Sequence, residues 1–378
     1  MRLTTLEYSE FKGLPDEWIA KPITFGPINL IVGTNSSGKS RILNVTNALA
    51  GLLAGKRAVL LSGSFRAQFV DDRQKKPKHL VYELHHEDSK VVLERFHVDG
   101  ELLLDRKKNG RGLIKALQLR KFIGFEAPSN ALAAVVRRDR IQHPFFEGLH
   151  QWGSTLKHYL FGSDFGKTNL AIFQESDKDS SRSPQIYEQT QVVSLYRQYR
   201  KELGARFDKA ILADMKAMGY PCQEIGLMTV PGVHGIRIPM WQLYLKERDL
   251  KCRTSQINMS QGMFRALALT MQLNASALSK SPDCVLIDDV SEGLDFDRAS
   301  RLISLLVGKA EKGHFQLIMT TNDRFVMNAV PLKYWSLLTR KKSVVYVLNE
   351  RNSPKQFKEF QYTGLSNFDF FKSAPSLK

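Results

Sequence analysis

Several residue types and patterns are scarce in this sequence, and each scarcity argues against a class of protein. Only three of the 378 residues are cysteine, and Cys222, Cys252 and Cys284 are scattered and without metal-ligand spacing. This argues against a disulfide scaffold and fits a reducing compartment. No apolar run approaches the ~20 residues that cross a membrane, and the first residues lack the apolar core of a signal peptide. We therefore expect a cytoplasmic protein with no membrane partner.

Acidic residues are also scarce relative to basic ones. The chain has 38 Asp and Glu against 55 Lys and Arg, which gives a formal net charge of +17. A surplus of this size favours polyanionic partners such as nucleic acid, an acidic protein or nucleotide phosphates, although a protein can simply be basic. With 43% hydrophobic and 25% charged residues the composition is that of a globular protein, which argues against wholesale disorder.

Hydrophobic patterning predicts both strands and helices. An apolar run at 28–32 predicts a buried strand, and apolar residues at helical spacing over 42–53 predict the helix after it. The pattern over 79–104 predicts strands, with Asp99-Gly100 as a hairpin turn. Apolar residues that step by three or four over 192–218 predict one long amphipathic helix with a weak point at Gly204. The chain is therefore predicted to have an α/β fold.

The order of these elements predicts how the chain is organised. Strand–helix alternation returns after about residue 240 and continues to about 348, and the residues beyond it are polar with late aromatics. We predict an α/β unit split by a mainly helical insertion and followed by an irregular tail. The predicted segments are 1–129 and 236–350 for the α/β unit, 130–235 for the insertion and 351–378 for the tail.

Residues 33–40, Gly-Thr-Asn-Ser-Ser-Gly-Lys-Ser, match the phosphate-binding loop (P-loop) pattern G-x-x-x-x-G-K-[ST] completely. The match lies between the predicted strand and the predicted helix, which is the context that the motif requires. The glycines let consecutive N–H groups face a phosphate, Lys39 reaches the β- and γ-phosphates, and Ser40 offers its hydroxyl to Mg²⁺. The predicted binding residues for ATP are Gly33, Thr34, Asn35, Ser36, Ser37, Gly38, Lys39, Ser40 and Arg41.

Two later stretches carry further candidate residues. An apolar strand that starts at 284 ends in Asp288, which is placed to hold Mg²⁺ through water, and is followed by Asp289, which could orient or deprotonate an attacking water. Upstream of this strand, Ser260-Gln261-Gly262 opens an amphipathic helix, so a hydroxyl and N–H groups point outward there. Each pattern is common when it occurs alone. Their order after the P-loop favours one shared nucleotide site.

This ordered set of motifs, together with Glu292-Gly-Leu-Asp295, resembles the ABC-type ATPase heads of the RecF/SMC/OLD-like branch. The stretch at 317–331 is similar to bacterial AAA-type ATPases of this branch that are found beside defence effectors. The resemblance covers about 1–125 and 240–350 and implies an ABC-type P-loop ATPase head with mixed sheets and flanking helices. It also implies that two heads sandwich two ATP molecules. Ser260, Gln261 and Gly262 would then contact the γ-phosphate held by the opposite P-loop, and Asp295 would lie in the loop that crosses the dimer.

Two positions depart from the pattern of these heads. The heads usually have Glu after the Mg²⁺-associated Asp, whereas Asp289 is one methylene shorter. They often have His where this chain has Asn322, and an amide cannot accept a proton at neutral pH. We therefore expect slow hydrolysis, with Asp289, Lys39 and Asn322 as the catalytic residues. The glutamine that senses Mg²⁺ in such heads has two candidates, Gln118 and Gln142.

Three functions stay open at this point. The first is an ATPase that acts as the sensor or regulatory subunit of a multi-component bacterial anti-phage defence system. Its effector would be a separate protein, because only residues 351–378 follow the head motifs. The second is a DNA repair or recombination ATPase that acts directly on nucleic acid. The third is a non-hydrolysing scaffold whose assembly depends on bound nucleotide.

Basic clusters make nucleic acid a candidate partner. The cluster at 137–140 leads into four aromatic residues, Phe145, Phe146, Trp152 and Tyr159. A mixture of basic and aromatic side chains can contact phosphates and stack on bases. The alternative is that the charges solvate loops and that the aromatic residues belong to the core. The four clusters are 73–78, 106–111, 137–140 and 340–342.

Overall fold

The computed structural model of the chain describes residues 1–73, 76–173, 188–230, 239–279 and 283–373. The chain divides into two compact units. Unit 1 consists of Met1–His158, Asp283–Ile287 and Gln316–Lys378. Unit 2 consists of Tyr159–Pro282 and Asp288–Phe315.

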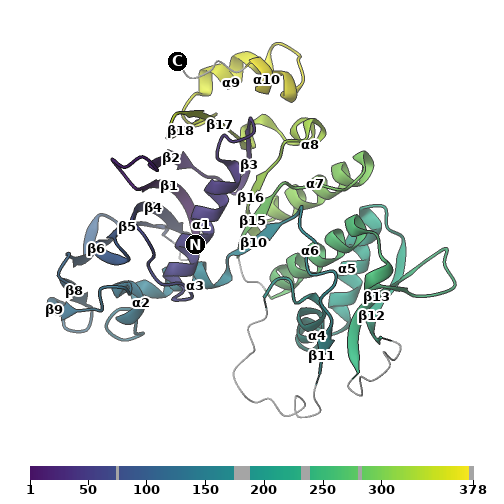
Figure 1. Cartoon of the computed structure of the whole chain (residues 1–378), viewed down its shortest axis with the longest axis horizontal. Coiled ribbons are helices and arrows are strands. Elements are labelled where there is room, and N and C mark those ends of the chain that lie inside the picture. The colour runs from purple at the N-terminus through teal and green to yellow at the C-terminus, as the bar shows by residue number, and fades with distance from the viewer. Residues whose placement is uncertain (74–75, 174–187, 231–238, 280–282, 374–378) are drawn as a thin grey trace. The chain divides into compact units, whose positions relative to one another are not determined.

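Unit 1 is built on a 14-stranded mixed sheet with the order β10-β15-β16-β3-β17-β18-β2-β1-β4-β5-β6-β7-β8-β9 (Figure 1). Its strands are β1 (Arg2–Glu10), β2 (Trp18–Thr24), β3 (Ile28–Gly33), β4 (Gly63–Asp71), β5 (Lys78–Glu87), β6 (Lys90–Val98), β7 (Glu101–Arg106), β8 (Arg111–Ala116), β9 (Lys121–Glu126), β10 (Lys157–Leu160), β15 (Asp283–Asp288), β16 (Phe315–Thr320), β17 (Trp335–Lys341) and β18 (Val344–Asn349). Its helices are α1 (Lys39–Leu53), α2 (Ala133–Val136), α3 (Glu147–Thr155), α8 (Arg324–Ala329), α9 (Pro354–Gln361) and α10 (Asn367–Ser373), with short 3₁₀ turns at Pro144–Phe146 and Leu332–Tyr334.

The two halves of the sheet follow from different sequence patterns. Every residue of β3 is buried, as expected for a continuous apolar strand whose neighbours β16 and β17 run parallel to it. Buried residues alternate with more exposed ones along β5, as expected for an antiparallel strand with one covered face. Asp99 (φ 51°) and Gly100 (φ 84°) form the two-residue turn between β6 and β7. The predicted strands at 28–32 and 79–104, the hairpin and the helix over 42–53 are confirmed.

The tail was predicted to be irregular, and this prediction is wrong. Residues beyond 351 form α9 and α10, which hold aromatic side chains in a packed cluster. The rings of Phe357 and Phe370 lie 4.7 Å apart, and Phe370 meets Trp335 edge-on at 6.5 Å. Burial of these rings stabilises two short helices whose own sequences give a weak helical signal.

Unit 2 combines helices with a small sheet in the order β11-β13-β12, in which β14 pairs with β13. Its elements are β11 (Ala171–Ile172), α4 (Val192–Leu203), α5 (Ala205–Ala217), β12 (Cys222–Thr229), β13 (Met240–Glu247), β14 (Thr254–Ser255), a 3₁₀ turn at Gln256–Asn258, α6 (Gln261–Leu278) and α7 (Phe296–Glu311). The helix predicted over 192–218 forms as two helices, which are separated at the predicted weak point, Gly204. Gly204 adopts φ 67° and ψ −159°, a backbone conformation outside any helix, and separates α4 from α5.

The compact units do not coincide with the segments predicted from the sequence. Residues 130–158 belong to unit 1 because α3 packs on α1, so closely that a Cβ on Gly153 would collide with the carbonyl oxygen of Ala50. Residues 261–278 belong to unit 2 because α6 packs against α5. These contacts divide the chain at 158/159 and not at 129/130.

Candidate nucleotide site

The P-loop connects β3 to α1 and depends on two glycines. Gly33 ends β3, and a Cβ there would lie 2.5 Å from Ser37 Oγ and 2.9 Å from the carbonyl oxygen of Leu338. Gly38 has φ 104°, which side chains rarely tolerate, and a Cβ there would lie 3.3 Å from the ring of Trp18. Both positions therefore require glycine for the loop to close tightly on the start of α1.

Polar groups inside this loop suit a phosphate. Lys39 is 6% exposed, and its Nζ donates hydrogen bonds to the carbonyl oxygens of Gly33 (2.8 Å) and Thr34 (3.2 Å). The Oγ of Ser37 is buried and has no hydrogen-bond partner among the described residues. Gly38 caps α1 without a side-chain acceptor, so the helix dipole favours an anion there. Thr34, Asn35, Ser36, Ser40 and Arg41 are exposed.

The edge of the sheet at which β3 ends collects residues from two other strands. Thr320 of β16 lies opposite Ile31, and Leu338 of β17 lies opposite Gly33, both in parallel pairs. The ends of β16 and β17 therefore lie at the edge that carries the P-loop. Asn322 follows β16 by two residues and is exposed. The structure thus brings Asn322 to the same edge of unit 1 as the P-loop.

Two arginines flank the P-loop on this edge. Arg41 forms an ion pair with Glu10 and lies over the ring of Trp18 at 4.4 Å. Burial lowers the pKa of the Arg41 guanidinium, Tyr8 opposes this shift, and the charge of Arg340 lowers it further. Arg340 donates from Nη1 to the carbonyl oxygen of Ser36 at 3.5 Å. The sequence showed Arg340 as part of a basic cluster but gave no sign of this contact.

In unit 2, Ser260 is the N-cap of α6, as predicted. Its Oγ accepts a hydrogen bond from the backbone N–H of Met263 at 3.2 Å. A Cβ on Gly262 would lie 2.9 Å from the carbonyl oxygen of Gly293, so the start of α6 sits directly on the loop after β15. Glycine at this position is therefore required by the close contact between helix and loop.

Arg265, one turn farther along α6, holds together the loop after β10 and the loop after β15. Its guanidinium donates to the carbonyl oxygens of Ser163 (2.7 Å), Gly162 (2.5 Å) and Glu292 (2.9 Å). Burial lowers the pKa of this guanidinium, and the charges of Glu292 and Asp164 oppose that shift. Gln261 adds a hydrogen bond from Nε2 to the carbonyl oxygen of Asp164 at 2.9 Å. Sequence reasoning missed this clamp, because its acceptors are backbone groups that leave no pattern.

The two consecutive aspartates lie at the end of β15. Asp288 is 8% exposed, and its carbonyl oxygen accepts from the backbone N–H of Phe161 at 3.0 Å. Asp289 has φ 50°, a left-handed conformation that Asp tolerates better than most residues, and so turns the chain sharply out of the strand. Asp295 caps α7 through the backbone N–H of Arg298 at 2.9 Å, and this hydrogen bond lowers the pKa of its carboxyl.

No family profile matches the chain, and no curated protein matches it. Two solved structures are similar to it over nearly their whole length. One is an SMC head bound to the C-terminal winged-helix domain of ScpA, with a TM-score of 0.54 and 13% identity over 94% of this chain and 100% of that chain. The other is an SMC head with an extended coiled coil, bound to the C-terminal domain of ScpA from Pyrococcus furiosus, with a TM-score of 0.50 and 12% identity over 95% and 99%. The chain has the fold of an SMC head. It is therefore an ABC-type ATPase head in fold, as predicted from the motifs.

Within this head fold, the two candidate glutamines lie together. Gln142 donates from Nε2 to Oε1 of Gln118 at 3.4 Å, and its backbone N–H donates to Asp139 at 2.5 Å. Among the described residues, neither glutamine makes a hydrogen bond to the P-loop. Their role in sensing Mg²⁺ stays a prediction.

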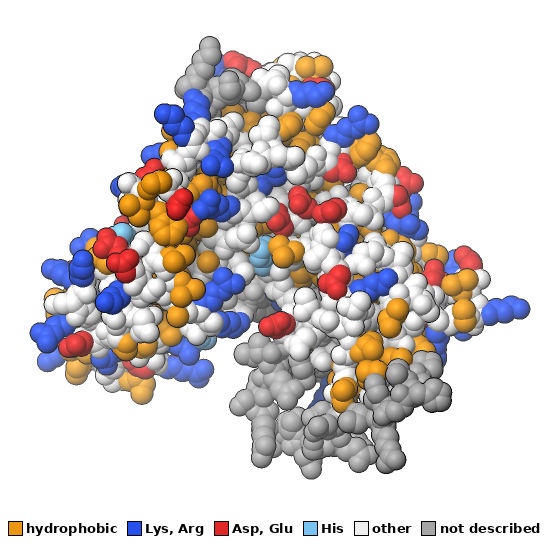
Figure 2. All heavy atoms as spheres, viewed as in Figure 1, with side chains coloured by type: hydrophobic (Ala, Val, Ile, Leu, Met, Phe, Trp, Pro, Cys, Tyr) orange, Lys and Arg blue, Asp and Glu red, His pale blue; other side chains and the backbone are white. Residues whose placement is uncertain are grey.

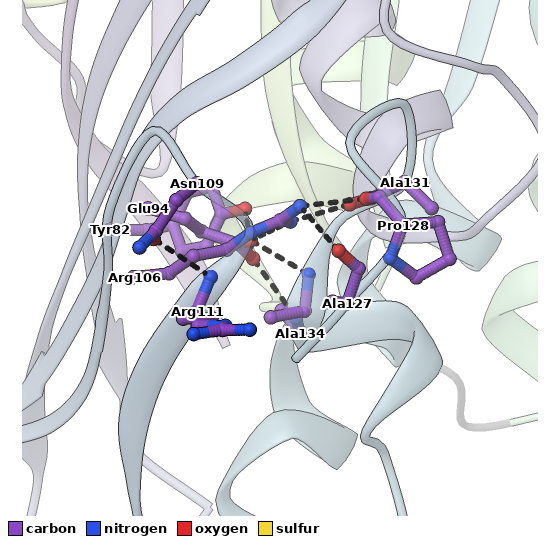
Figure 3. Close-up of polar contacts among 10 residues, drawn as sticks. Tyr82, Glu94, Arg106, Asn109, Arg111, Ala127, Pro128, Ala131 and Ala134 are labelled. Carbon is purple, nitrogen blue, oxygen red and sulfur yellow. Dashed lines mark hydrogen bonds and ion pairs between the residues drawn. The ribbon is translucent and has the colours of Figure 1, made fainter. Parts of the chain in front are cut away.

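Among the described residues of the four basic clusters, every Lys and Arg is exposed except Arg106. Arg106 is fully buried and binds Glu94 together with three backbone carbonyls (Figure 3). Phe146, Trp152 and Tyr159 are at most 3% exposed, which favours the alternative that these aromatic residues belong to the core, and Phe145 is half-buried. On the face shown in Figure 2, Lys and Arg side chains are spread around the strands β6, β8 and β9, with acidic and hydrophobic side chains between them.

Two features are absent from the part of the chain that the structure describes. No group of three or more His, Cys, Asp or Glu side chains there could hold a metal ion by itself. No helix there is both long and apolar enough to cross a membrane.

Proposed function

We propose that the chain binds ATP with Mg²⁺ at residues 33–41 and that two copies pair around the bound nucleotide. The observation that carries the first part is the P-loop cradle. It combines the buried cation of Lys39, the unpartnered buried hydroxyl of Ser37 and the uncapped start of α1. These groups offer a positive charge and donors to a phosphate in a space that side chains at Gly33 or Gly38 would disturb.

The residues of the chain take distinct roles in this proposal. Lys39 would exchange its carbonyl partners for the β- and γ-phosphates, and the hydroxyl of Ser40 and the carboxylate of Asp288 would hold the metal. Mg²⁺, when bound, neutralises charge on the phosphates. Asp289 orients the attacking water or accepts its proton, and Asn322 holds the γ-phosphate or the water by hydrogen bonds. Because Asp289 is short and Asn322 takes no proton, hydrolysis is slow.

Pairing of two copies is supported by the start of α6. Ser260, Gln261 and Gly262 form an electropositive helix start that is 220 residues beyond Ser40 (260 − 40). In a two-fold pair, the helix start of each copy covers the P-loop of the other, so both sites are completed together. The solved structures that share the fold are described as bound to ScpA, and a protein partner is part of the proposal for this chain also.

The expected role in bacterial anti-phage defence, with a separate effector protein, rests on the sequence resemblance alone and stays a prediction. The same holds for a direct action on nucleic acid and for a non-hydrolysing scaffold. ATP turnover measured with and without duplex DNA separates these three, because the scaffold shows no turnover and the repair enzyme is stimulated by DNA.

The experiment that tests the proposed function is ATP binding by isothermal calorimetry with Mg²⁺. Lys39→Ala removes the cation from the phosphates and should weaken binding by at least about tenfold, because charge-assisted hydrogen bonds to phosphate are among the strong ones. Lys56→Ala is the matched control, since Lys56 is an exposed lysine just beyond α1. Equal affinity in all three proteins would contradict the proposed site.

A further inference from the structure

Two surfaces of the chain carry opposite charge. The end of β17 and the first residue of the turn after it, here together called the basic turn, are Arg340, Lys341 and Lys342, and all three are exposed. The segment 288–297, here called the acidic segment, carries five carboxylates and no Lys or Arg. The basic turn belongs to unit 1 and the acidic segment to unit 2.

The basic turn is fixed beside the P-loop. Arg340 contacts the carbonyl oxygen of Ser36 at the tip of the P-loop (3.5 Å) and the carbonyl oxygen of Lys342 (2.7 Å). Leu338, two residues before Arg340, lies opposite Gly33. A molecule that covers the exposed side of the P-loop therefore also reaches the basic turn.

The acidic segment is fixed beside the start of α6. Gly262 packs on the backbone of Gly293, and Arg265 holds the carbonyl oxygen of Glu292 at 2.9 Å. Glu292, Asp295 and Asp297 are exposed, and Asp295 forms an ion pair with Arg298 at 2.9 Å, so Glu292 and Asp297 carry the argument for charge complementarity. A surface that receives Ser260 therefore also receives these carboxylates.

We propose that the basic turn is the docking site for the acidic segment of a second copy of this chain. The inference rests on the proposed function, because it names the surfaces that meet when two copies pair. Charge complementarity selects a second copy as the occupant, since one chain carries both surfaces and each lies beside the half of the nucleotide site that the pairing joins. By two-fold symmetry the contact occurs twice in each pair.

Such a contact acts mainly on the rate at which two copies associate and on the orientation in which they pair. Complementary patches steer two proteins together and raise the association rate by about 10- to 1,000-fold at low salt, whereas like charges oppose pairing. Salt screens exposed charges within about 10 Å at 0.1 M. The contribution of the basic turn should therefore be largest at low salt and should shrink as salt is added.

The test uses charge reversal in the full chain. Lys341→Glu with Lys342→Glu reverses the basic turn but keeps Arg340 on the P-loop, and Glu292→Lys with Asp297→Lys reverses the acidic segment but keeps the α7 cap Asp295. The control is Lys355→Glu with Lys358→Glu on the exposed face of α9, which changes the net charge by the same amount and sign as the reversed basic turn. ATP-dependent pairing is followed by stopped-flow light scattering and by sedimentation.

We expect each reversed pair to slow association at least about tenfold at low salt, and the control to associate like the unchanged chain. The chain that carries both reversals should pair again, because its two surfaces are complementary once more. If Glu292→Lys with Asp297→Lys fails to fold, as judged by its melting curve, Asp297→Lys alone should show the same slowing in smaller degree.

Several results would overturn the inference. One is pairing at an unchanged rate in both reversed variants, with ATP binding intact, which would leave the proposed function standing. Another is loss of duplex DNA binding in Lys341→Glu with Lys342→Glu while pairing is unchanged, which would assign the basic turn to nucleic acid. Failure of ATP to bind the unchanged chain would remove the proposed function itself, and the inference with it.

Discussion

The buried arginine of unit 1 gives the most quantitative prediction. Arg106 and Glu94 are both 0% exposed and lie opposite each other on β7 and β6, with Nη1 of Arg106 3.3 Å from Oε2 of Glu94 (Figure 3). Glu94 also accepts hydrogen bonds from the hydroxyl of Tyr82 and from the backbone N–H groups of Ala133 and Ala134, at 2.7–3.0 Å. Arg106 in turn donates to the carbonyl oxygens of Ala127, Pro128 and Ala131.

Arg106→Met should therefore lower the free energy of unfolding substantially. Removing one partner of a buried ion pair leaves an uncompensated charge and costs about 3–5 kcal/mol. Burial already raises the pKa of Glu94, so the folded state binds a proton at this carboxyl more readily than the unfolded state. A group of this kind stabilises the folded state more as the pH falls. The defect of Arg106→Met should thus become smaller on acidification from neutral pH.

The assay is equilibrium urea unfolding followed by circular dichroism, with Lys107→Met as the matched control. Lys107 is the next residue and is exposed, so its replacement should shift the unfolding midpoint little. Adding Glu94→Gln to Arg106→Met should restore part of the stability, because the amide oxygen still accepts the N–H groups but carries no charge. If Arg106→Met unfolds at the same urea concentration as Lys107→Met, the reasoning is refuted.

Two further predictions concern the proposed catalytic carboxylate and the response to acid. Asp289→Asn should bind Mg-ATP normally but hydrolyse it about 100-fold more slowly or worse, since a general base supplies at least that factor; unchanged turnover in a phosphate-release assay would move the role to another residue, with Glu292 the next candidate. Burial lowers the pKa of His86, so the folded state resists a proton that the unfolded state accepts below about pH 6.5. Thermal stability should therefore fall as the pH drops below about 6.5, and less so in His86→Gln, whereas equal losses in the two proteins would exclude this histidine as a cause.

The elements that carry the motifs could be predicted because their signals are local in the sequence. A P-loop needs Gly33 and Gly38 at fixed spacing between an apolar strand and a helix, and all of these lie within 26 consecutive residues, 28–53. The start of α6 at Ser260 follows from one polar residue before a long apolar helix. The strand before Asp288 is a short apolar run of the same kind.

Features that depend on distant partners could not be predicted. Arg106 begins a run of basic residues that looks like an exposed basic turn in the sequence. Only the pairing of β6 with β7 places Glu94 opposite it. Phe370 packs on both Phe357 and Trp335, but these rings come from α10, α9 and β17, so the sequence shows them only as scattered aromatic residues. The contact of Arg340 with the P-loop joins positions 304 residues apart.

Mixing two inactive variants tests the central claim, that two copies complete each other's nucleotide sites. Ser260→Arg should bind ATP as a single chain but neither pair nor hydrolyse, and Lys39→Ala should lack the P-loop cation. In a mixed pair, the intact Ser260 of one copy faces the intact P-loop of the other. Equal mixing should therefore restore turnover to at most about half of the level of the unchanged chain, because each mixed pair has one complete site out of two. Normal pairing and turnover by Ser260→Arg alone would contradict the account.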